Sequence, residues 1–331
     1  SAGLLFVGPR GAGANPGPAC YGLGGTEPTV TDALLVLGRL KPGPYAGGAV
    51  SLDEERANIV VSEKVAGPLG IDLDAAASGI IRLLEQNLLH ALQQISIQRG
   101  YDPRDFTLFA YGGAGPLHGA EVADLLGIPE VVVPPHPGIT SAGGLLTTDL
   151  KYDQIKTEFQ VKGSVDLNKI NRDFQALSAE LLEQFASDGL TEAEVEQLRF
   201  GDLRYVGQGY ELRVTFPQGA LDSAALEQVW QAFHELHAQE YGHFFADSPI
   251  EIVNIRLTGV GKMPKIANPP APIGESLGAA EVKTATSVFR VDGALQRLKT
   301  KFYIRAKLPP EITFDGPAVI LQKDTTSVVP P

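Results

Sequence analysis

A glycine-rich turn is the part of the sequence whose residue types most clearly permit chemistry. Residues 108–119 read LFAYGGAGPLHG, so an apolar run directly precedes the glycines. Glycines at such a position let a ligand approach the backbone, and the free amides of a following helix bind polar groups. The same pattern also suits a tight strand-to-helix turn that binds nothing. Gly112, Gly113, Ala114 and Gly115 are therefore candidate ligand-binding residues.

His118 follows this turn directly and is the histidine best placed to act on a ligand bound there. Imidazole titrates near neutral pH and also binds metals, so His118 is a candidate general acid–base or metal ligand. His136, at the end of another predicted strand, is the second choice. His234, His237 and Glu240 follow one another at three-residue spacing, which permits a zinc site but is more typical of a solvated helix face.

Cys20 and Asp32 lie in or next to a segment dense in glycine and proline, which predicts an ordered surface loop that ends in a helix over residues 32–40. We expect Thr31 to cap that helix. Asp32 is then either a base or metal ligand in a cleft, or a residue that stabilises the helix start. Cys20 is interpreted as a small buried hydrophobe, since no residue near it in sequence would lower the pKa of its thiol. The alternative is a metal site in which Asp32 and His118 converge, with Cys20 as a third ligand.

The elements that would position these residues form an α/β pattern. Periodic apolar positions and turn signals predict helices over 52–66, 73–98, 117–126 and 139–146, with buried strands over 106–111 and 130–133. Strand, glycine turn, helix and strand in this order are typical of a parallel α/β layer, in which ligands bind at the carboxyl ends of the strands.

The character of the sequence changes near residue 150. We expect helices over 167–186 and 223–241, two strands within 197–216, a strand over 251–260, a proline-rich linker over 268–272, and short strands over 302–305, 318–321 and 327–329. The sequence therefore predicts three parts. They are an α/β lobe over 1–150, an α+β domain over 151–267, and a linker with a β-rich segment over 268–331 that packs on that domain.

Composition excludes several classes of function. The chain has 331 residues with 27 Lys+Arg and 39 Asp+Glu, a formal net charge of −12, which disfavours nucleic acid and anionic membranes as partners. Its apolar runs fall far short of the ~20 residues that span a bilayer. A single cysteine forms no intramolecular disulfide. We therefore expect a cytoplasmic protein with neither a nucleic-acid nor a membrane partner.

Several segments together resemble the A subunit of the hydantoinase/5-oxoprolinase family, which includes related subunits of acetone and acetophenone carboxylases. The segments are 8–9 (GP), 12–22 (AGANPGPACYG), 25–33 (GTEPTVTDA), 111–118 (YGGAGPLH), 134–138 (PPHPG), 204–212 (RYVGQGYEL), 251–256 (EIVNIR) and 316–331. The resemblance covers essentially the whole chain.

This resemblance implies a fold like that of actin, sugar kinases and Hsp70, with two α/β lobes that close over ATP. Residues 106–119 would then be the adenosine-side glycine motif of the second lobe, which makes residues 112–115 candidate nucleotide-binding residues. The family's Asp-x-Gly-Gly-Thr phosphate motifs normally come earlier and do not occur here. We therefore expect part of the second lobe followed by an α+β domain, as the C-terminal half of a subunit. The abrupt start in a strand-like run, Leu4 to Val7, agrees with a cut chain.

The resemblance also implies a reaction, which is ATP-driven hydrolysis of a cyclic amide such as 5-oxoproline or hydantoin. ATP with Mg²⁺ would activate the amide oxygen, with Asp32 and His118 as candidate catalytic residues and Zn²⁺ or Mn²⁺ as a candidate second metal. The implied partner is a hydantoinase B-type subunit in an oligomer. One alternative is an ATP-dependent ketone carboxylase subunit. The other is a non-catalytic half that docks its partner and binds nucleotide weakly. The isolated half is expected to be inactive.

Overall fold

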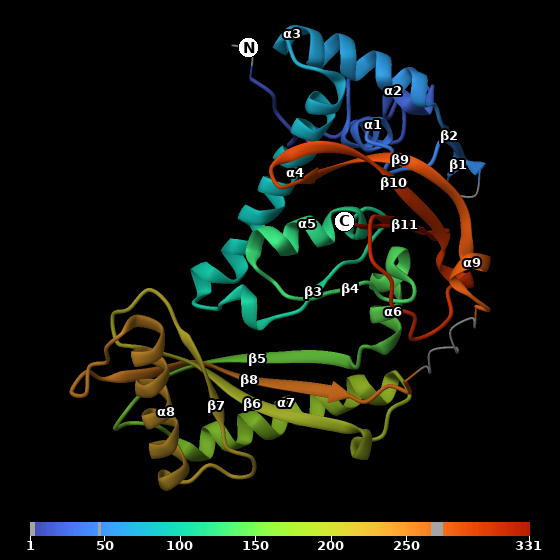
Figure 1. The fold of residues 1–331 in the computed structure, drawn as a ribbon. Helices are drawn as coiled ribbons and strands as arrows, with labels where there is room; N and C mark the ends of the chain where they lie inside the picture. Colours follow the sequence, from blue (N-terminus) through green and yellow to red (C-terminus); the bar gives the residue numbers. More distant parts are fainter. Residues whose placement is uncertain (1–3, 46–47, 266–273) are drawn as a thin grey trace. The chain divides into compact units, whose positions relative to one another are not determined.

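The computed structural model describes residues 4–45, 48–265 and 274–331, and they form two compact units (Figure 1). Unit 1 combines residues 1–143 with residues 268–331, and unit 2 consists of residues 144–267. The division after Gly143 lies close to the boundary predicted near 150. The predicted proline-rich linker over 268–272 lies outside the described residues. Within the described ranges, no helix is both long and apolar enough to cross a bilayer.

The C-terminal segment corrects the predicted domain organisation. It belongs to unit 1 and not, as expected, to one domain with residues 151–267, and in the core of unit 1 Val288, Phe289 and Phe302 join Leu34 and Leu35. Backbone contacts across the same interface include the bond from the amide of residue 288 to the carbonyl of residue 37, at 2.8 Å. The expectation was wrong because apolar strands carry no local signal for the partner that will cover them.

Unit 1 contains helices, two small strand pairs and a four-stranded sheet. Its α-helices are α1 (Val30–Val36), α2 (Glu54–Val61), α3 (Gly67–Leu69), α4 (Leu73–Ile95), α5 (Gly115–Leu126) and α9 (Leu277–Ala280), while α6 (Thr140–Thr147) crosses the division. The strand pairs are antiparallel β1 (Gly43–Tyr45) with β2 (Val50–Leu52), and parallel β3 (Leu108–Phe109) with β4 (Val131–Val132). The sheet has the order β12 (Thr326–Val329), β11 (Ala318–Leu321), β10 (Ala294–Ile304) and β9 (Glu281–Val291).

Several predicted elements of unit 1 differ in extent from those observed. The helix predicted over 32–40 is α1, which begins earlier because Thr29, not Thr31, is its N-cap. The strand predicted over 106–111 shrinks to the two residues of β3, and it is not buried, since Phe106, Phe109 and Tyr111 are about half exposed. The order β3, α5, β4 with parallel pairing confirms the strand–helix–strand prediction.

Unit 2 is a four-stranded antiparallel sheet that packs against two helices. The sheet order is β5 (Leu150–Val161), β8 (Ile250–Gly261), β6 (Val195–Tyr205) and β7 (Leu212–Phe216), and the helices are α7 (Leu167–Ser187) and α8 (Ser223–Tyr241). On α7 the residues Ile170, Phe174, Leu177, Leu181 and Phe185 are buried at helical spacing. Both helices follow the predicted bounds closely.

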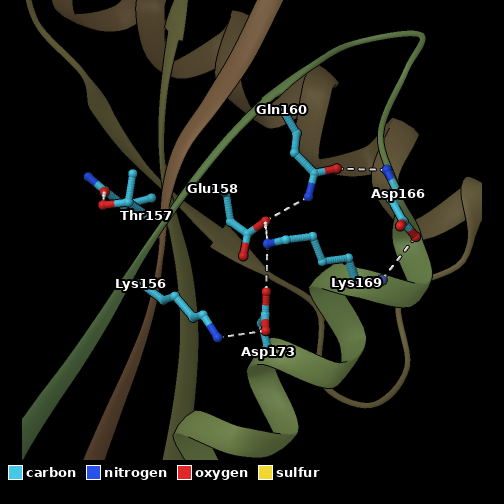
Figure 2. Close-up of polar contacts among 8 residues, drawn as sticks. Lys156, Thr157, Glu158, Gln160, Asp166, Lys169 and Asp173 are labelled. Atoms are coloured by element: carbon cyan, nitrogen blue, oxygen red, sulfur yellow. Dashed lines mark hydrogen bonds and ion pairs between the residues drawn. The ribbon is translucent and has the colours of Figure 1, made fainter.

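A network of charged side chains joins β5 to α7 in unit 2 (Figure 2). Oε2 of the fully buried Glu158 side chain accepts hydrogen bonds from Lys169 Nζ at 2.7 Å and from Gln160 Nε2 at 2.6 Å. Asp173 accepts from Lys156 and Lys169, both at 2.7 Å, and these bonds hold the pKa of Asp173 well below its usual range. Each carboxylate in this network therefore has a lysine within hydrogen-bond distance.

Candidate functional site

A cavity of about 650 Å³ in unit 1 lies beside the glycine turn. Gly113, Ala114 and Gly115 line it together with His118, which lies in the first turns of α5. The loop and strand start at residues 322–326 supply another part of the wall. Apolar side chains of α1, α4 and the β1–β2 pair complete the lining. The structure thus brings the predicted glycine motif and His118 to one cavity.

The glycines of this turn have distinct physical roles. Gly112 has φ +83°, a left-handed conformation that favours glycine, whereas an added Cβ at Gly113 or Gly115 would meet no atom closer than 3.7 Å. A Cβ at Gly119 would lie 3.0 Å from Ala110 and 3.2 Å from Val131, so this glycine lets α5 pack on the strand pair. Gly113 and Gly115 are therefore free of steric constraint from the protein itself.

The N-terminus of α5 faces the cavity without a side-chain cap. Its N-cap is Ala114, which offers no side-chain acceptor, and a proline occupies the second position of the helix. The first amides of a helix have no partner within that helix and carry the positive end of its dipole. Pro116 has no amide hydrogen, and the Leu117 amide donates to the Ala114 carbonyl at 3.0 Å, so the donor that this twelve-residue helix presents at the glycine turn is the Gly115 amide.

His118 is a buried histidine with no hydrogen-bond partner among the described residues. Its side chain is 4% exposed, and neither Nδ1 nor Nε2 has a partner. The nearest ionisable oxygen is Oε1 of Glu85 on α4, 3.6 Å from Nδ1. Burial lowers the pKa of His118 to about 4, so the imidazole is neutral at pH 7. One ring nitrogen is then a donor and the other an acceptor, and both lack a partner.

Three further ionisable groups surround His118. Arg39 donates to Glu121 Oε2 at 2.9 Å and to the Val288 carbonyl at 3.2 Å. Burial and the neighbouring Glu121 carboxylate raise the pKa of Glu85 to about 9. Burial also opposes ionisation of Glu121, but the hydrogen bond with Glu85 and the charge of Arg39 outweigh it and lower its pKa. Arg39 therefore pairs with Glu121 and not with Glu85, and Glu85 keeps its proton at neutral pH.

The sequence did not single out Arg39, Glu85 or Glu121. A signal for Glu85 was nevertheless present. It lies four residues after Ile81 and three before Leu88, on the apolar stripe of the predicted helix, where a carboxyl group needs a special environment. Arg39 and Glu121 gave no comparable signal, because their contacts join segments 82 residues apart.

Asp32 takes the helix-stabilising role of the two that the sequence left open. It is fully buried, and its Oδ1 accepts from the Cys20 amide at 2.8 Å. Its Oδ2 accepts from the amide of Thr29 at 2.8 Å and from the Thr29 hydroxyl at 2.7 Å. Asp32 and Thr29 form a capping box at the start of α1. The carboxylate is committed to these bonds and is not available as a base.

Cys20 and Asp32 do not fit a metal. The Cys20 thiol is fully buried, and burial together with the hydrogen bond to Asp32 raises its pKa far above the usual range, whereas metals bind the thiolate. Within residues 4–45, 48–265 and 274–331, no group of three His, Cys, Asp or Glu side chains is arranged to hold a metal ion. The predicted metal site of Asp32, His118 and Cys20 is therefore not formed.

The other histidine predictions also change. His136 is exposed and precedes a 3-10 turn, Pro137–Ile139. His237 is 1% exposed and its Nδ1 donates to the carbonyl of residue 243 at 2.6 Å, which leaves Nε2 to accept from Gln208 at 3.2 Å. Tyr205 bonds His234 Nδ1 at 2.7 Å. The face of α8 that carries His234 and His237 is thus neither solvated nor a zinc site but part of a hydrogen-bonded network, and Glu240 is exposed.

The fold is mixed α/β, and a cavity lies at the glycine turn. A sequence model described as hydantoinase/oxoprolinase matches residues 1–154, and one described as the hydantoinase/oxoprolinase C-terminal domain matches residues 160–331. The chain belongs to the hydantoinase/oxoprolinase family, as an A-type subunit sequence.

Named relatives and solved structures agree with this assignment. The alpha subunit of caprolactamase from Pseudomonas jessenii is 34% identical over 99% of this chain and 48% of its own length. The gamma subunit of acetophenone carboxylase from Aromatoleum aromaticum is 34% identical over 99% of this chain and 46% of its own. The crystal structure of the ATP-dependent caprolactamase from P. jessenii matches with a TM-score of 0.81 at 34% identity, over 100% of this chain and 48% of that one. A nucleotide-free structure from work on ATP-dependent acetone carboxylation matches with a TM-score of 0.77 at 28% identity, over 95% and 46%. The chain spans about half the length of these relatives.

Proposed function

We propose that this chain carries the adenine-nucleotide pocket of a subunit that uses ATP to activate a cyclic amide for hydrolysis. The observation that carries the proposal is the cavity of unit 1, in which the glycine turn and the uncapped start of α5 face the same space as His118. In this proposal, unit 1 is part of the second lobe of an actin-like ATPase fold.

The cavity residues would bind and orient the nucleotide rather than transfer protons. Gly113 and Gly115 leave room for a ligand against the backbone, and the Gly115 amide supplies a donor. His118 is neutral at pH 7 and a weak base, so it suits a hydrogen-bonding role better than acid–base catalysis. Its two unpartnered nitrogens carry a desolvation cost that a ligand donor or acceptor would relieve.

ATP is the expected co-substrate because an amide is a poor electrophile. Transfer of the γ-phosphoryl group from ATP to the amide oxygen would release ADP and leave an electrophilic carbon. Water would add to that carbon, and the C–N bond would break with a proton transferred to the nitrogen, which opens the ring. A second water molecule would then hydrolyse the resulting acyl phosphate to a carboxylate and inorganic phosphate. The names of two structural neighbours, an ATP-dependent caprolactamase and an ATP-dependent carboxylase, support ATP use in this family. Mg²⁺ would accompany the phosphates when ATP is bound.

The candidate substrates are small cyclic amides, 5-oxoproline, hydantoin and N-methylhydantoin among them. The lactam hydrolase among the relatives favours this class. A second candidate is carboxylation of a small ketone with the same ATP-driven step, and the 34% identity to the acetophenone carboxylase gamma subunit favours it. Because these relatives are named as subunits, we propose a hetero-oligomer with a hydantoinase B-type partner.

The test uses the full-length subunit with its B-type partner. ADP release and ring opening are measured with each cyclic amide, and ADP release is measured in parallel with acetone or acetophenone plus bicarbonate. Ring opening coupled to ADP release supports the hydrolase. ADP release that only a ketone with bicarbonate stimulates moves the protein to the carboxylase class. A stable complex without either activity supports a docking role instead.

Two glycine variants connect that activity to the cavity. Gly113→Ala and Gly115→Ala add a methyl group that makes only ordinary van der Waals contacts, at 3.8 and 3.7 Å, so both should fold normally but obstruct a ligand at the turn. We expect KM for ATP to rise about tenfold or more in each. Gly209→Ala in unit 2 is the control, since an added Cβ there meets no atom within 4 Å. Unchanged kinetics in all three variants would place the nucleotide elsewhere.

A further inference from the structure

The loop between β11 and β12 lies directly on the glycine turn, although some 200 residues separate them in sequence. Thr325 Oγ1 lies 3.1 Å from the carbonyl oxygens of both Gly112 and Gly113, to which it donates its single proton. Asp324 Oδ2 accepts from the Gly138 amide at 2.8 Å. Thr325 is buried. The C-terminal loop therefore contacts the turns that follow both strands of the β3–β4 pair.

This loop also forms a wall of the cavity and brings a lysine to it. Residues 322–326 line the cavity, and Lys323 is the one lysine or arginine among the described residues of its lining. Lys323 is exposed and makes no ion pair with any described residue. The one acid of the lining is Asp324, whose Oδ2 is held by the Gly138 amide.

The charge of the whole chain makes this lysine informative. With a formal net charge of −12, the protein repels a polyphosphate at long range, so a nucleotide pocket needs local positive charge. The α5 N-terminus supplies only partial charge from backbone amides. A lysine is a mobile point charge on a flexible stem, which suits phosphate groups.

We propose that Lys323 binds the phosphate groups of the nucleotide in this cavity, and that Thr325 is a positioning residue that fixes the glycine turn. This inference rests on the proposed function, because it assumes that the cavity holds a nucleotide. It assigns a binding role to the C-terminal end of the chain. The glycine turn and Lys323 would then contact one ligand from opposite ends of the sequence.

The experiment compares ligands that contain the phosphate groups, the nucleoside, or both. Binding of ATP, ADP, adenosine and inorganic pyrophosphate to the full-length subunit is measured by isothermal titration calorimetry for the wild type, Lys323→Ala and Lys323→Arg. For Lys323→Ala we expect a Kd for ATP and ADP that is about 10- to 100-fold higher, with adenosine unchanged. Arginine keeps the charge and should restore most of the affinity. Lys299→Ala, at an exposed lysine of β10, is the matched control.

Thr325 has its own pair of variants. Thr325→Val keeps the shape of the side chain but removes the hydroxyl donor, and Thr325→Ser keeps the donor. If Thr325 positions the turn, valine weakens binding of ATP and adenosine by similar factors and serine restores both. The thermal unfolding midpoint of each variant is measured alongside, and weaker binding in Thr325→Val with an unchanged midpoint would separate positioning from a stability defect.

The outcomes distinguish failure of this inference from failure of the proposed function. Wild-type protein that binds neither ATP nor adenosine would refute the proposed function. ATP binding in wild type that Lys323→Ala leaves unchanged would refute the role of Lys323 alone. Pyrophosphate that binds as tightly as ATP and depends on Lys323 would indicate a phosphate site without nucleotide specificity, which contradicts the inference. Serine that fails to rescue binding at residue 325 would overturn the positioning role.

Discussion

Two groups of ionisable side chains, one in each unit, stabilise their buried carboxyl groups in different ways. In unit 2, Glu158 and Asp173 each lie 2.7 Å from a lysine nitrogen, and Asp173 has a lowered pKa (Figure 2). In unit 1, Arg39 pairs with Glu121, and Glu85 has a pKa of about 9. Each carboxylate of the first group therefore has a lysine partner, whereas the second group holds a protonated acid.

The difference separates a structural role from a functional one. The lysines of the unit 2 network join α7 to its sheet, and their hydrogen bonds lower the pKa of Asp173. Groups whose pKa is strongly shifted toward the neutral form, by contrast, are common at sites that bind ligands or do chemistry. The cluster around His118 has such perturbed groups, has unpartnered nitrogens and borders a cavity. The network around Glu158 has one unpartnered oxygen, and none of its residues lines that cavity.

The largest expected effect comes from removal of Arg39, the cation that pairs with Glu121 in the unit 1 cluster. Arg39→Met leaves Glu121 without its buried partner and should lower the free energy of unfolding by about 3–5 kcal/mol. Lys169→Met in unit 2 is the matched control, and its cost should be about 1 kcal/mol because Lys169 is 43% exposed. Urea denaturation measures both. Equal losses in the two variants would erase the contrast between the clusters.

A smaller effect is expected when the carboxyl group of Glu85 is replaced by a neutral amide. Its pKa is about 9 in the folded protein against 4.5 as the ordinary value, so the folded state binds more protons between these pH values. Stability from this group is therefore fully present below pH 4.5 and is lost as pH rises toward 9. Glu85→Gln removes that loss and should raise the free energy of unfolding at pH 8 by about 2 kcal/mol.

The check is the unfolding free energy of wild type and Glu85→Gln at pH 5, 6.5 and 8. The gap between them should widen as pH increases. A gap that stays constant, or a variant less stable than wild type at pH 8, would mean that Glu85 is ionised like the carboxylates of unit 2.

The smallest effect is expected when Glu158 in the network of unit 2 is replaced by glutamine. Glu158→Gln keeps a side-chain acceptor for Lys169 but removes the negative charge, which should cost about 1 kcal/mol at pH 7. Trp230 is the single tryptophan of the chain and lies in the core of unit 2, so its fluorescence reports this loss. A gain in stability for Glu158→Gln, as predicted for Glu85→Gln, would show that the two clusters are alike.

Local patterns in the sequence predicted much of the fold. Apolar periodicity gave α7 and α8 nearly to the residue, and the glycine turn marked the start of α5. The capping box of Thr29 and Asp32 was also readable from its spacing, yet the nearer Thr31 was preferred as the cap. Each of these features depends on residues within a few positions of one another.

What the sequence could not predict depends on contacts between distant segments. Val288 meets the end of α1 across about 250 residues, and Thr325 meets the glycine turn across 212. Neither pairing has a signal in composition or spacing, so the C-terminal segment was assigned to the wrong unit. The sequence therefore predicts a candidate site at the glycines and at His118, but it does not single out Glu85 or Lys323.

We propose that an adenine nucleotide binds in the cavity between the glycine turn and the C-terminal loop of unit 1. The most direct measurement is photolabelling of the full-length subunit with 8-azido-ATP, in competition with ATP, followed by peptide mapping. We expect the label that ATP competes away to fall within the peptides that contain residues 110–118 and 322–326. Label confined to residues 144–267, or label that ATP does not displace, would contradict it.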